Sequence, residues 1–193
     1  FESAGTLAWF YCWTATVIFQ LFIVFIAPVV ILPLFNKYVP LEEGELRKEI
    51  ENYARSQQFK IKGIFKMDAS RRSSKSNAFF AGFGKFRRIA LFDTLIEKHT
   101  TNEIVSILAH EIGHYKKKHI LKNMMLSVLV SAVMFFMLSF FIENKGLFKA
   151  FKVKETSIYA SIVFFGFLFS PMNFIVSIFS NYLSRKYEYE ADS

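Results

Sequence analysis

The residues best suited to chemistry lie in "VSILAHEIGHYKKKHI", residues 105–120, which contains the pattern H-E-x-x-H. On a helix, positions i and i+4 share a face, so His110 and His114 can both offer an imidazole nitrogen to one metal ion. Zn²⁺ accepts two imidazoles and a carboxylate and keeps a fourth position for water. Glu111 can take a proton from that water and later deliver it to a leaving amine. The spacing therefore predicts a zinc-dependent peptide hydrolase with one Zn²⁺ per chain.

A third metal ligand is expected among the acidic residues of "SRKYEYEAD" near the end of the sequence. The H-x-x-G-x-x-H extension does not follow, and on an unbroken helix His119 would lie about 140° round from His114. If the acidic segment is helical, Glu188 and Asp192 share a face and Glu190 points elsewhere. We predict Glu188 as the third ligand and Asp192 as a partner that orients a ligand or the substrate.

Three stretches are long enough to cross a bilayer, because a span needs about 20 apolar residues. They predict transmembrane spans within residues 1–36, 123–142 and 157–184. The chain is 53% hydrophobic and contains 25 Phe, which is unusual for a soluble domain. The net charge of +8 is therefore assigned to basic residues that flank the spans, and not to nucleic-acid binding. Buried core helices are the alternative, and three such runs in one short chain disfavour it.

A polar segment, residues 37–122, separates the first two spans and carries the H-E-x-x-H pattern. "LEEGELRKEIENYARSQQ" has helical spacing, and "IKGIFKMDAS" is typical of a strand. "NAFFAGFGKFRRIALFD" predicts two short strands around the turn "AGFGK". The helix that follows is expected to start with Thr101 as its cap and to run directly into the second span. The predicted fold is mainly α, a multi-pass membrane protein with three transmembrane helices, a zinc-protease helix and a small β-hairpin.

The order of the spans predicts which segments share a side of the membrane. The loop 143–156 would lie opposite the polar segment, so residues 185–193 would return to the side of the H-E-x-x-H helix. The excess of Lys and Arg in the polar segment favours the cytoplasm for that side. The lysines at 116–118 are expected at the membrane interface, which would place the site at the membrane boundary.

Four motifs that occur in order resemble one known family. "LPLFNKYVPLEEGELRKEIE", "RRSSKSNAFFAGFGKFRRIALFDTLIE", "HEIGHYKKKH" and "SRKYEYEAD" are similar to the integral-membrane type 1 CAAX prenyl protease family, over about residues 14–193. The residues of "GFGK" and "HEIGHYKKKH" resemble those of bacterial members more than those of eukaryotic ones. The resemblance implies His110, His114 and Glu188 as zinc ligands, Glu111 as the base and a catalytic role for Asp192.

The resemblance also implies an architecture and a class of substrate. Family members have seven membrane helices around a chamber, so we expect this chain to be a fragment that holds three of them. The implied partners are the lipid bilayer and a peptide or protein substrate, including prenylated C-terminal peptides. A bacterial inner membrane is the favoured location, and the endoplasmic reticulum membrane is expected if the source is eukaryotic.

Asn77 and Ala78 are the predicted substrate contacts, because "SNAFF" could form an edge strand that holds an extended peptide. An ordinary hairpin in which Asn77 closes a turn is the alternative, and the residues alone favour it. Two other functions also stay open. One is a heat-shock-type quality-control metalloprotease with the same site, and the other is a non-catalytic membrane scaffold or transporter element. A transporter more often has ionisable residues inside its spans, and these spans have none.

Overall fold

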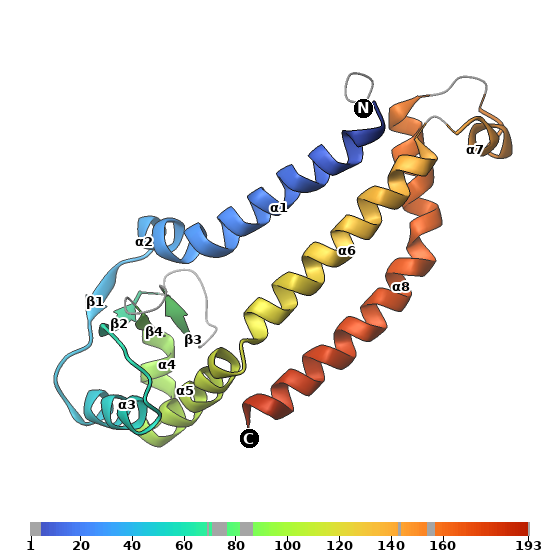
Figure 1. The fold of residues 1–193 in the computed structure, drawn as a ribbon. Coiled ribbons are helices and arrows are strands. Elements are labelled where there is room, and N and C mark those ends of the chain that lie inside the picture. Colours follow the sequence, from blue (N-terminus) through green and yellow to red (C-terminus); the bar gives the residue numbers. More distant parts are fainter. Residues whose placement is uncertain are drawn as a thin grey trace. The chain divides into compact units, whose positions relative to one another are not determined.

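The structure is a computed structural model that describes residues 5–68, 70, 77–81, 87–142, 144–153 and 157–192. The chain divides into two compact units (Figure 1). The first unit contains residues 1–20 and 120–187, and the second contains residues 21–119 and 188–193.

Long apolar helices dominate the first unit. They are most of α1 (Ala8–Ile26), α6 (His119–Phe141) and most of α8 (Ile158–Ala191), together with the short helices η1 (Gly5–Leu7) and α7 (Lys145–Ala150). The three long helices are each long and apolar enough to cross a membrane. An α-helix makes its backbone hydrogen bonds within the segment and needs no water for them. Long runs of Leu, Val, Ile and Phe therefore suit helices in a hydrocarbon surround.

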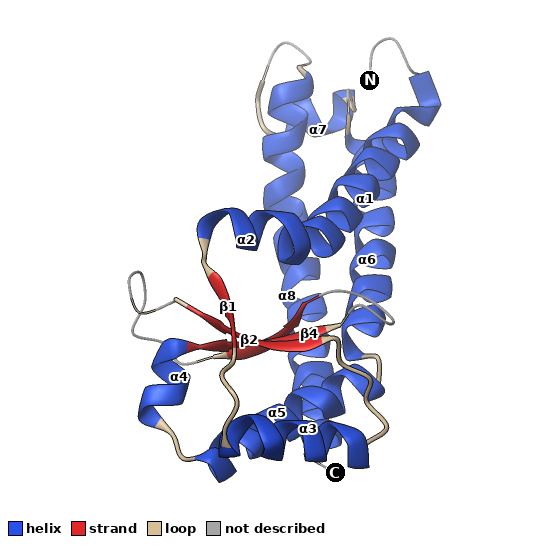
Figure 2. Cartoon of the chain, turned by 90° about the vertical axis from the view of Figure 1, so that its left-hand side faces the viewer, coloured by secondary structure: helices blue, strands red, loops and turns tan. Residues whose placement is uncertain are grey.

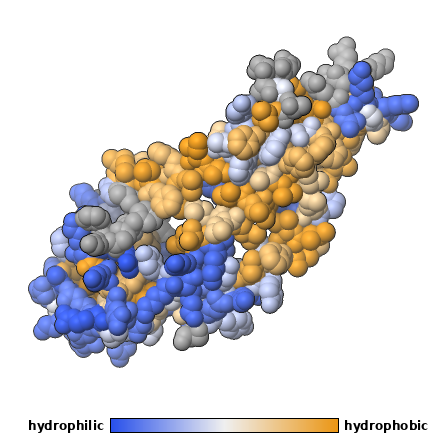
Figure 3. All heavy atoms as spheres, viewed as in Figure 1, coloured by the Kyte–Doolittle hydropathy of each residue, from blue (hydrophilic) through white to orange (hydrophobic). Residues whose placement is uncertain are grey.

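Helices α1 and α6 are joined by polar as well as aromatic contacts. The indole Nε1 of Trp13 donates a hydrogen bond to the backbone oxygen of Val128 at 3.2 Å. Gln20 Nε2 donates to Ser127 Oγ at 2.6 Å. Many large apolar side chains of these helices nevertheless face outward, as the orange spheres over them show (Figure 3). The expectation of apolar spans is therefore confirmed, although the segment boundaries predicted for the membrane crossings stay a prediction.

The second unit contains a four-stranded sheet in the order β1-β2-β4-β3 (Figure 2). Its strands are β1 (Tyr38–Pro40), β2 (Gly63–Met67), β3 (Ala78–Ala81) and β4 (Arg88–Phe92). β3 pairs antiparallel with β4, as the predicted hairpin requires. The sheet is larger than that hairpin: β2 pairs in parallel with β4, and β1 pairs antiparallel with the other edge of β2. The predicted turn "AGFGK", residues 81–85, lies outside the described residues except for Ala81, which ends β3.

Helices α3 (Glu45–Ser56) and α5 (Thr101–Lys116) cover one face of the sheet, and α4 (Asp93–Lys98) follows β4 directly (Figure 2). The second unit also includes the end of α1, the π-helix η2 (Ala27–Ile31) and α2 (Leu32–Phe35). Its core is apolar and comes from both layers. The fully buried members are Ile50, Ile64, Ala78, Ile89, Leu91, Leu95, Ile104 and Leu108.

Both ends of α5 differ from the sequence-based expectation. Thr100, not Thr101, is the N-cap: it accepts a hydrogen bond from the Glu103 backbone, and the Glu103 side chain bonds back to the Thr100 backbone. This capping box satisfies two backbone donors that a helix start leaves unpaired. At its other end α5 stops at Lys116, and Lys118 has φ 57° before α6 begins at His119. The zinc-protease helix therefore does not run straight into the second span.

Candidate metal centre

Three donor atoms converge in the second unit, where His110, His114 and Glu188 meet. His110 Nε2 lies 3.0 Å from His114 Nε2 and 3.1 Å from Glu188 Oε2, and the remaining distance, from His114 Nε2 to Glu188 Oε2, is 3.5 Å. Two bonds of about 2.0–2.1 Å to one Zn²⁺ at the tetrahedral angle put their donor atoms about 3.3 Å apart. The three side chains therefore fit one face of a tetrahedral zinc site.

Two helices supply these donors. His110 and His114 lie one turn apart on α5, and Glu188 lies on the last turns of α8, which continues without a break to Ala191. Gly113 allows the two helices to approach closely, because a Cβ at this position would lie 2.9 Å from the Ala191 Cα and even closer to its backbone oxygen. The space beside Gly113 is thus occupied by the backbone of Ala191.

Asp192 contacts His110 at Nδ1, the ring nitrogen that is not in the donor cluster. Its Oδ1 lies 2.7 Å from His110 Nδ1, so His110 can keep its proton on Nδ1 and present the lone pair of Nε2 to a metal. This hydrogen bond, followed by the negative charges nearby, raises the pKa of His110 above its usual value. The structure thus brings Asp192 to His110 itself, which is the ligand-orienting position considered for it.

Glu111 lies half-buried beside the three donors. Burial raises the pKa of its carboxyl group, while the neighbouring histidines counteract part of that rise. A carboxyl group whose pKa moves towards neutrality is a better proton acceptor and donor at physiological pH than an ordinary glutamate. Position and pKa both suit a group that moves a proton to and from water.

His119 and Glu190 also belong to this cluster, and the sequence reasoning had placed both of them elsewhere. His119 Nδ1 lies 2.9 Å from His114 Nδ1, and His119 Nε2 lies 3.1 Å from Glu190 Oε2. The helix is not unbroken between His114 and His119, because the left-handed residue Lys118 turns His119 back towards His114. A histidine five residues after the end of the H-E-x-x-H pattern, together with an acidic residue that the predicted ligand set did not use, was the available signal.

Asn77 and Ala78 lie at the start of β3, which is an edge strand that packs on α5. Asn77 is exposed, whereas the side chain of Ala78 is buried in the core with 1% exposure. Ala78 can therefore meet a substrate only through its main chain. The Asn77 side chain also accepts a hydrogen bond from the Ala78 backbone at 2.9 Å. Substrate contact at both residues stays a prediction.

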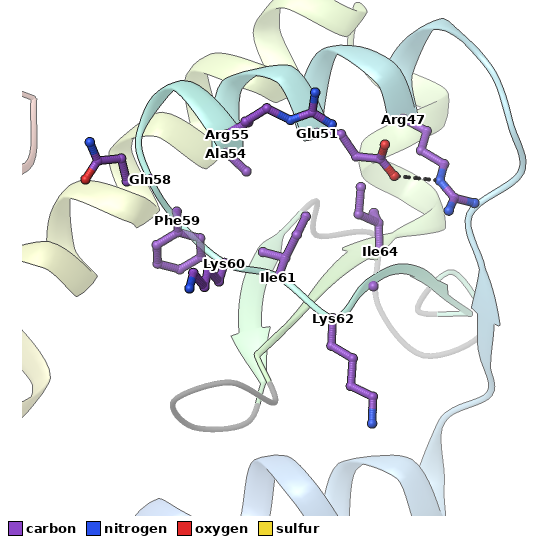
Figure 4. Close-up of a pocket in the computed structure, with 11 residues that line it drawn as sticks. Arg47, Glu51, Ala54, Arg55, Gln58, Phe59, Lys60, Ile61, Lys62 and Ile64 are labelled. Carbon is purple, nitrogen blue, oxygen red and sulfur yellow. Dashed lines mark hydrogen bonds and ion pairs between the residues drawn. The ribbon is translucent and has the colours of Figure 1, made fainter.

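Two hollows among the described residues of the second unit differ in character. One of about 450 Å³ lies beside the metal centre and is lined by His110, Gly113 and Asp192 among others. A larger one of about 630 Å³ lies between α3 and the chain leading into β2 (Figure 4). Arg47 in this larger hollow is paired with Glu51 at 2.9 Å and with Glu43. Of the described residues that line it, none is a histidine, so size does not mark the chemical site.

Known proteins share both parts of the chain. Residues 40–193 match the model of peptidase family M48, and residues 1–37 match the CAAX prenyl protease N-terminal model, which is described as five membrane helices. A probable CAAX prenyl protease 1 from Schizosaccharomyces pombe is 40% identical over 184 residues, which make up 95% of this chain and 39% of that protein. The human CAAX prenyl protease 1 homolog is 33% identical over the whole chain and 49% of its own length.

A solved structure shows the same fold. The crystal structure of S. mikatae Ste24p matches with a TM-score of 0.83 and 36% identity, over 95% of this chain and 46% of that one. The chain thus spans less than half the length of these relatives, and it shares their mainly helical, multi-pass membrane fold. Because the family match extends over residues 40–193 and includes every residue of the metal centre, the chain belongs to peptidase family M48.

Proposed function

We propose that this protein is a zinc-dependent membrane endopeptidase that hydrolyses peptide bonds with metal-activated water. The observation that carries the proposal is the convergence of His110, His114 and Glu188, with donor atoms 3.0–3.5 Å apart. Membership of a metalloprotease family implies a metal cofactor. Two imidazoles and one carboxylate are the donor set of catalytic zinc sites, which supports Zn²⁺ as that metal.

The side chains around the donors supply the remaining parts of a hydrolase. Zinc bound at these donors would acidify water and polarise the scissile carbonyl. Glu111 accepts the proton of the attacking water and returns it to the leaving nitrogen. Asp192 holds the proton on His110 Nδ1, so that Nε2 keeps its lone pair for the metal.

The edge of β3 offers a way to hold an extended peptide. Phe92 N donates to Asn77 O at 3.1 Å, and Ala78 lies opposite Leu91. In an antiparallel pair, hydrogen-bonded and non-hydrogen-bonded positions alternate. Ala78 and Phe80 therefore direct their backbone groups away from β4, towards the open side of the sheet. We propose that the main chain of this edge, with Asn77, aligns a substrate strand beside α5.

The names of the relatives suggest the substrate class. They are described as CAAX prenyl proteases, so we propose peptides with prenylated C-termini as substrates of this protein. The excess of basic residues beside the spans supports a site that faces the cytoplasm. The relatives described above are eukaryotic, which supports the endoplasmic reticulum membrane, and the bacterial inner membrane favoured by the motif wording stays an untested expectation.

Metal content of the detergent-purified full-length protein tests the proposed function directly. We expect about one zinc per chain in the native protein and loss of that zinc in both His110→Ala and Glu188→Ala, because each removes one of three protein ligands. His99→Ala and Glu97→Ala are matched controls, since both residues lie outside the donor cluster. Zinc that persists in Glu188→Ala would move the third ligand elsewhere. A folded native protein without zinc would contradict the proposal.

A further inference from the structure

His119 is the most deeply buried of the four histidines. Its side chain is 3% exposed, against 22% for His114 and 29% for His110. A buried imidazole is stable only when its ring nitrogens have hydrogen-bond partners. Each ring nitrogen of His119 has a partner in the metal centre: Nδ1 lies 2.9 Å from His114 Nδ1, and Nε2 lies 3.1 Å from Glu190 Oε2. The ring therefore joins a ligand histidine to a carboxylate.

The chemistry of these partners determines the direction of the hydrogen bonds. An ionised carboxylate only accepts, so the contact with Glu190 requires the proton of a neutral His119 to be on Nε2. His119 Nδ1 is then an acceptor, and His114 must donate to it from its own Nδ1. A neutral His114 with its proton on Nδ1 has a lone pair on Nε2. That is the atom 3.0 Å from His110 Nε2 at the centre of the donor cluster.

The two ligand histidines are thus held in parallel ways. His110 has a carboxylate on its Nδ1 directly, from Asp192 at 2.7 Å. His114 reaches a carboxylate through one intervening imidazole. Both carboxylates, and the ligand Glu188 itself, come from the last turns of α8 and the residue after them. One short segment therefore supplies a metal ligand together with the groups that orient the other two.

We propose that His119 and Glu190 are positioning residues that hold the His114 imidazole in the tautomer and orientation that offer Nε2 to the metal. The inference rests on the proposed function, because it assumes that His114 is a metal ligand. Lys118 makes the arrangement possible: its φ of 57° ends the course of α5 and turns His119 back against His114. On a continuous helix the two rings would lie about 140° apart, and no such contact would form.

We call the chain of contacts from His114 through His119 to Glu190 the relay. Zinc affinity of the full-length detergent-purified protein, measured by competition with a chromophoric chelator, tests it. We expect His119→Leu to weaken zinc binding by about 10- to 100-fold, the usual consequence of losing a group that orients a metal ligand. Glu190→Gln keeps an acceptor for His119 but loses the charge, so we expect a smaller, several-fold loss. His99→Leu and Glu97→Gln are the matched controls, and both should bind zinc as the native protein does.

The double variant His119→Leu/Glu190→Gln shows whether the two residues affect zinc affinity through one relay or independently. If Glu190 acts through His119, then Glu190→Gln should add nothing in the His119→Leu background. Additive losses would overturn the relay. The absorption bands of the cobalt-substituted protein provide a second readout, since a reoriented His114 should change the bands in His119→Leu and leave them unchanged in His99→Leu. Identical bands and identical affinity in His119→Leu would likewise overturn it.

Two further comparisons keep the test decisive if His119→Leu does not fold or if the native protein binds no zinc. If His119→Leu does not fold, His119→Asn replaces it: the amide can accept from His114 but cannot reach Glu190, so intermediate affinity is expected. Affinity of Glu190→Gln equal to that of Glu97→Gln would then overturn the relay. Native zinc binding that is lost in His110→Ala but unchanged in His119→Leu refutes the relay alone. A native protein without zinc would overturn both the relay and the proposed function.

Discussion

The sheet layer of the second unit and the long helices of the first unit place their large apolar side chains in opposite ways. Between the sheet and helices α3 and α5 many of them are buried, and Ile89 and Leu91 are 0% exposed. In the first unit they face outward, and Phe167 and Phe19 are 71% and 65% exposed. Outward aromatic rings on this scale suit a hydrocarbon surround, whereas a buried core suits water. The exposed fraction therefore has a different meaning in each unit.

The polar groups differ in the same way. In the second unit carboxylates and histidines form a connected cluster around the candidate metal centre. In the first unit two hydrogen bonds join α1 and α6, and aromatic contacts join other helices, such as the rings of Phe148 in α7 and Phe164 in α8, whose centroids lie 5.5 Å apart. The second unit thus depends on exact hydrogen-bond geometry, and the first on packing and on its solvent. Substitutions of the same kind should affect them differently.

The largest effect on activity should come from the second unit. We expect Glu111→Gln to lower peptide cleavage by about 10²- to 10⁴-fold, because it removes the group that transfers the proton. Zinc content should stay native, since Glu111 is not among the three donors. Glu97→Gln, at an exposed position of α4, is the control and should cleave normally. A Glu111→Gln protein with near-native cleavage would move proton transfer to another residue.

Glycine-to-alanine substitutions should have opposite outcomes in the two units. Gly113→Ala puts a methyl group into the backbone of Ala191, so the end of α8 must retreat and take Glu188 with it. We expect about a 100-fold loss of activity, because a displacement of about 1 Å is enough for that. Gly166→Ala meets nothing within 4 Å and should leave activity and melting temperature unchanged or slightly raise the latter.

Measuring cleavage and zinc affinity for both glycine variants sharpens the comparison. Equal behaviour of Gly113→Ala and Gly166→Ala would mean that α5 and the end of α8 do not need their close approach.

A charge on the outward face of the first unit tests whether lipid surrounds it. Lys in place of Phe167 should cost about 2.5–3.5 kcal/mol of insertion free energy if the position lies near the bilayer centre. Glu97→Lys in the second unit should cost nothing measurable, because that position faces water. The yield of folded protein extracted from membranes measures both, with Phe167→Leu as the apolar control. Equal yields of Phe167→Lys and Phe167→Leu would place this face in water.

The smallest expected effect concerns pH and the metal-free protein. The contact with Asp192 raises the pKa of His110 in the folded state. The stability that it contributes is therefore fully present below the ordinary histidine pKa and is lost as the pH rises through the raised value. Between about pH 5 and 8 we expect the melting temperature of chelator-treated protein to fall by about 1–2 °C more than in Asp192→Asn. Identical pH profiles would remove the pair from the stability of this unit.

Much of the local structure could be predicted from residue spacing. The expected mainly α membrane fold and the β3–β4 hairpin are confirmed. Strands β1 and β2 pair with partners far away in the sequence, and their order follows from nonlocal packing that no short pattern encodes. Thr100 was missed by one residue as the cap of α5, because Thr100 and Thr101 are equivalent in type and only the backbone conformation distinguishes them.

For the candidate site, the sequence by itself determined which residues can share a helix face. The four-residue spacings put His110 with His114, and Glu188 with Asp192, because the helix period is local. Only the tertiary structure decided that these two faces meet, through the space that Gly113 leaves for Ala191. It also decided that His119 and Glu190 join them. Lys118 adopts a left-handed backbone with φ 57°, which is rare for a residue with a side chain, so helical spacing alone could not predict the turn before His119.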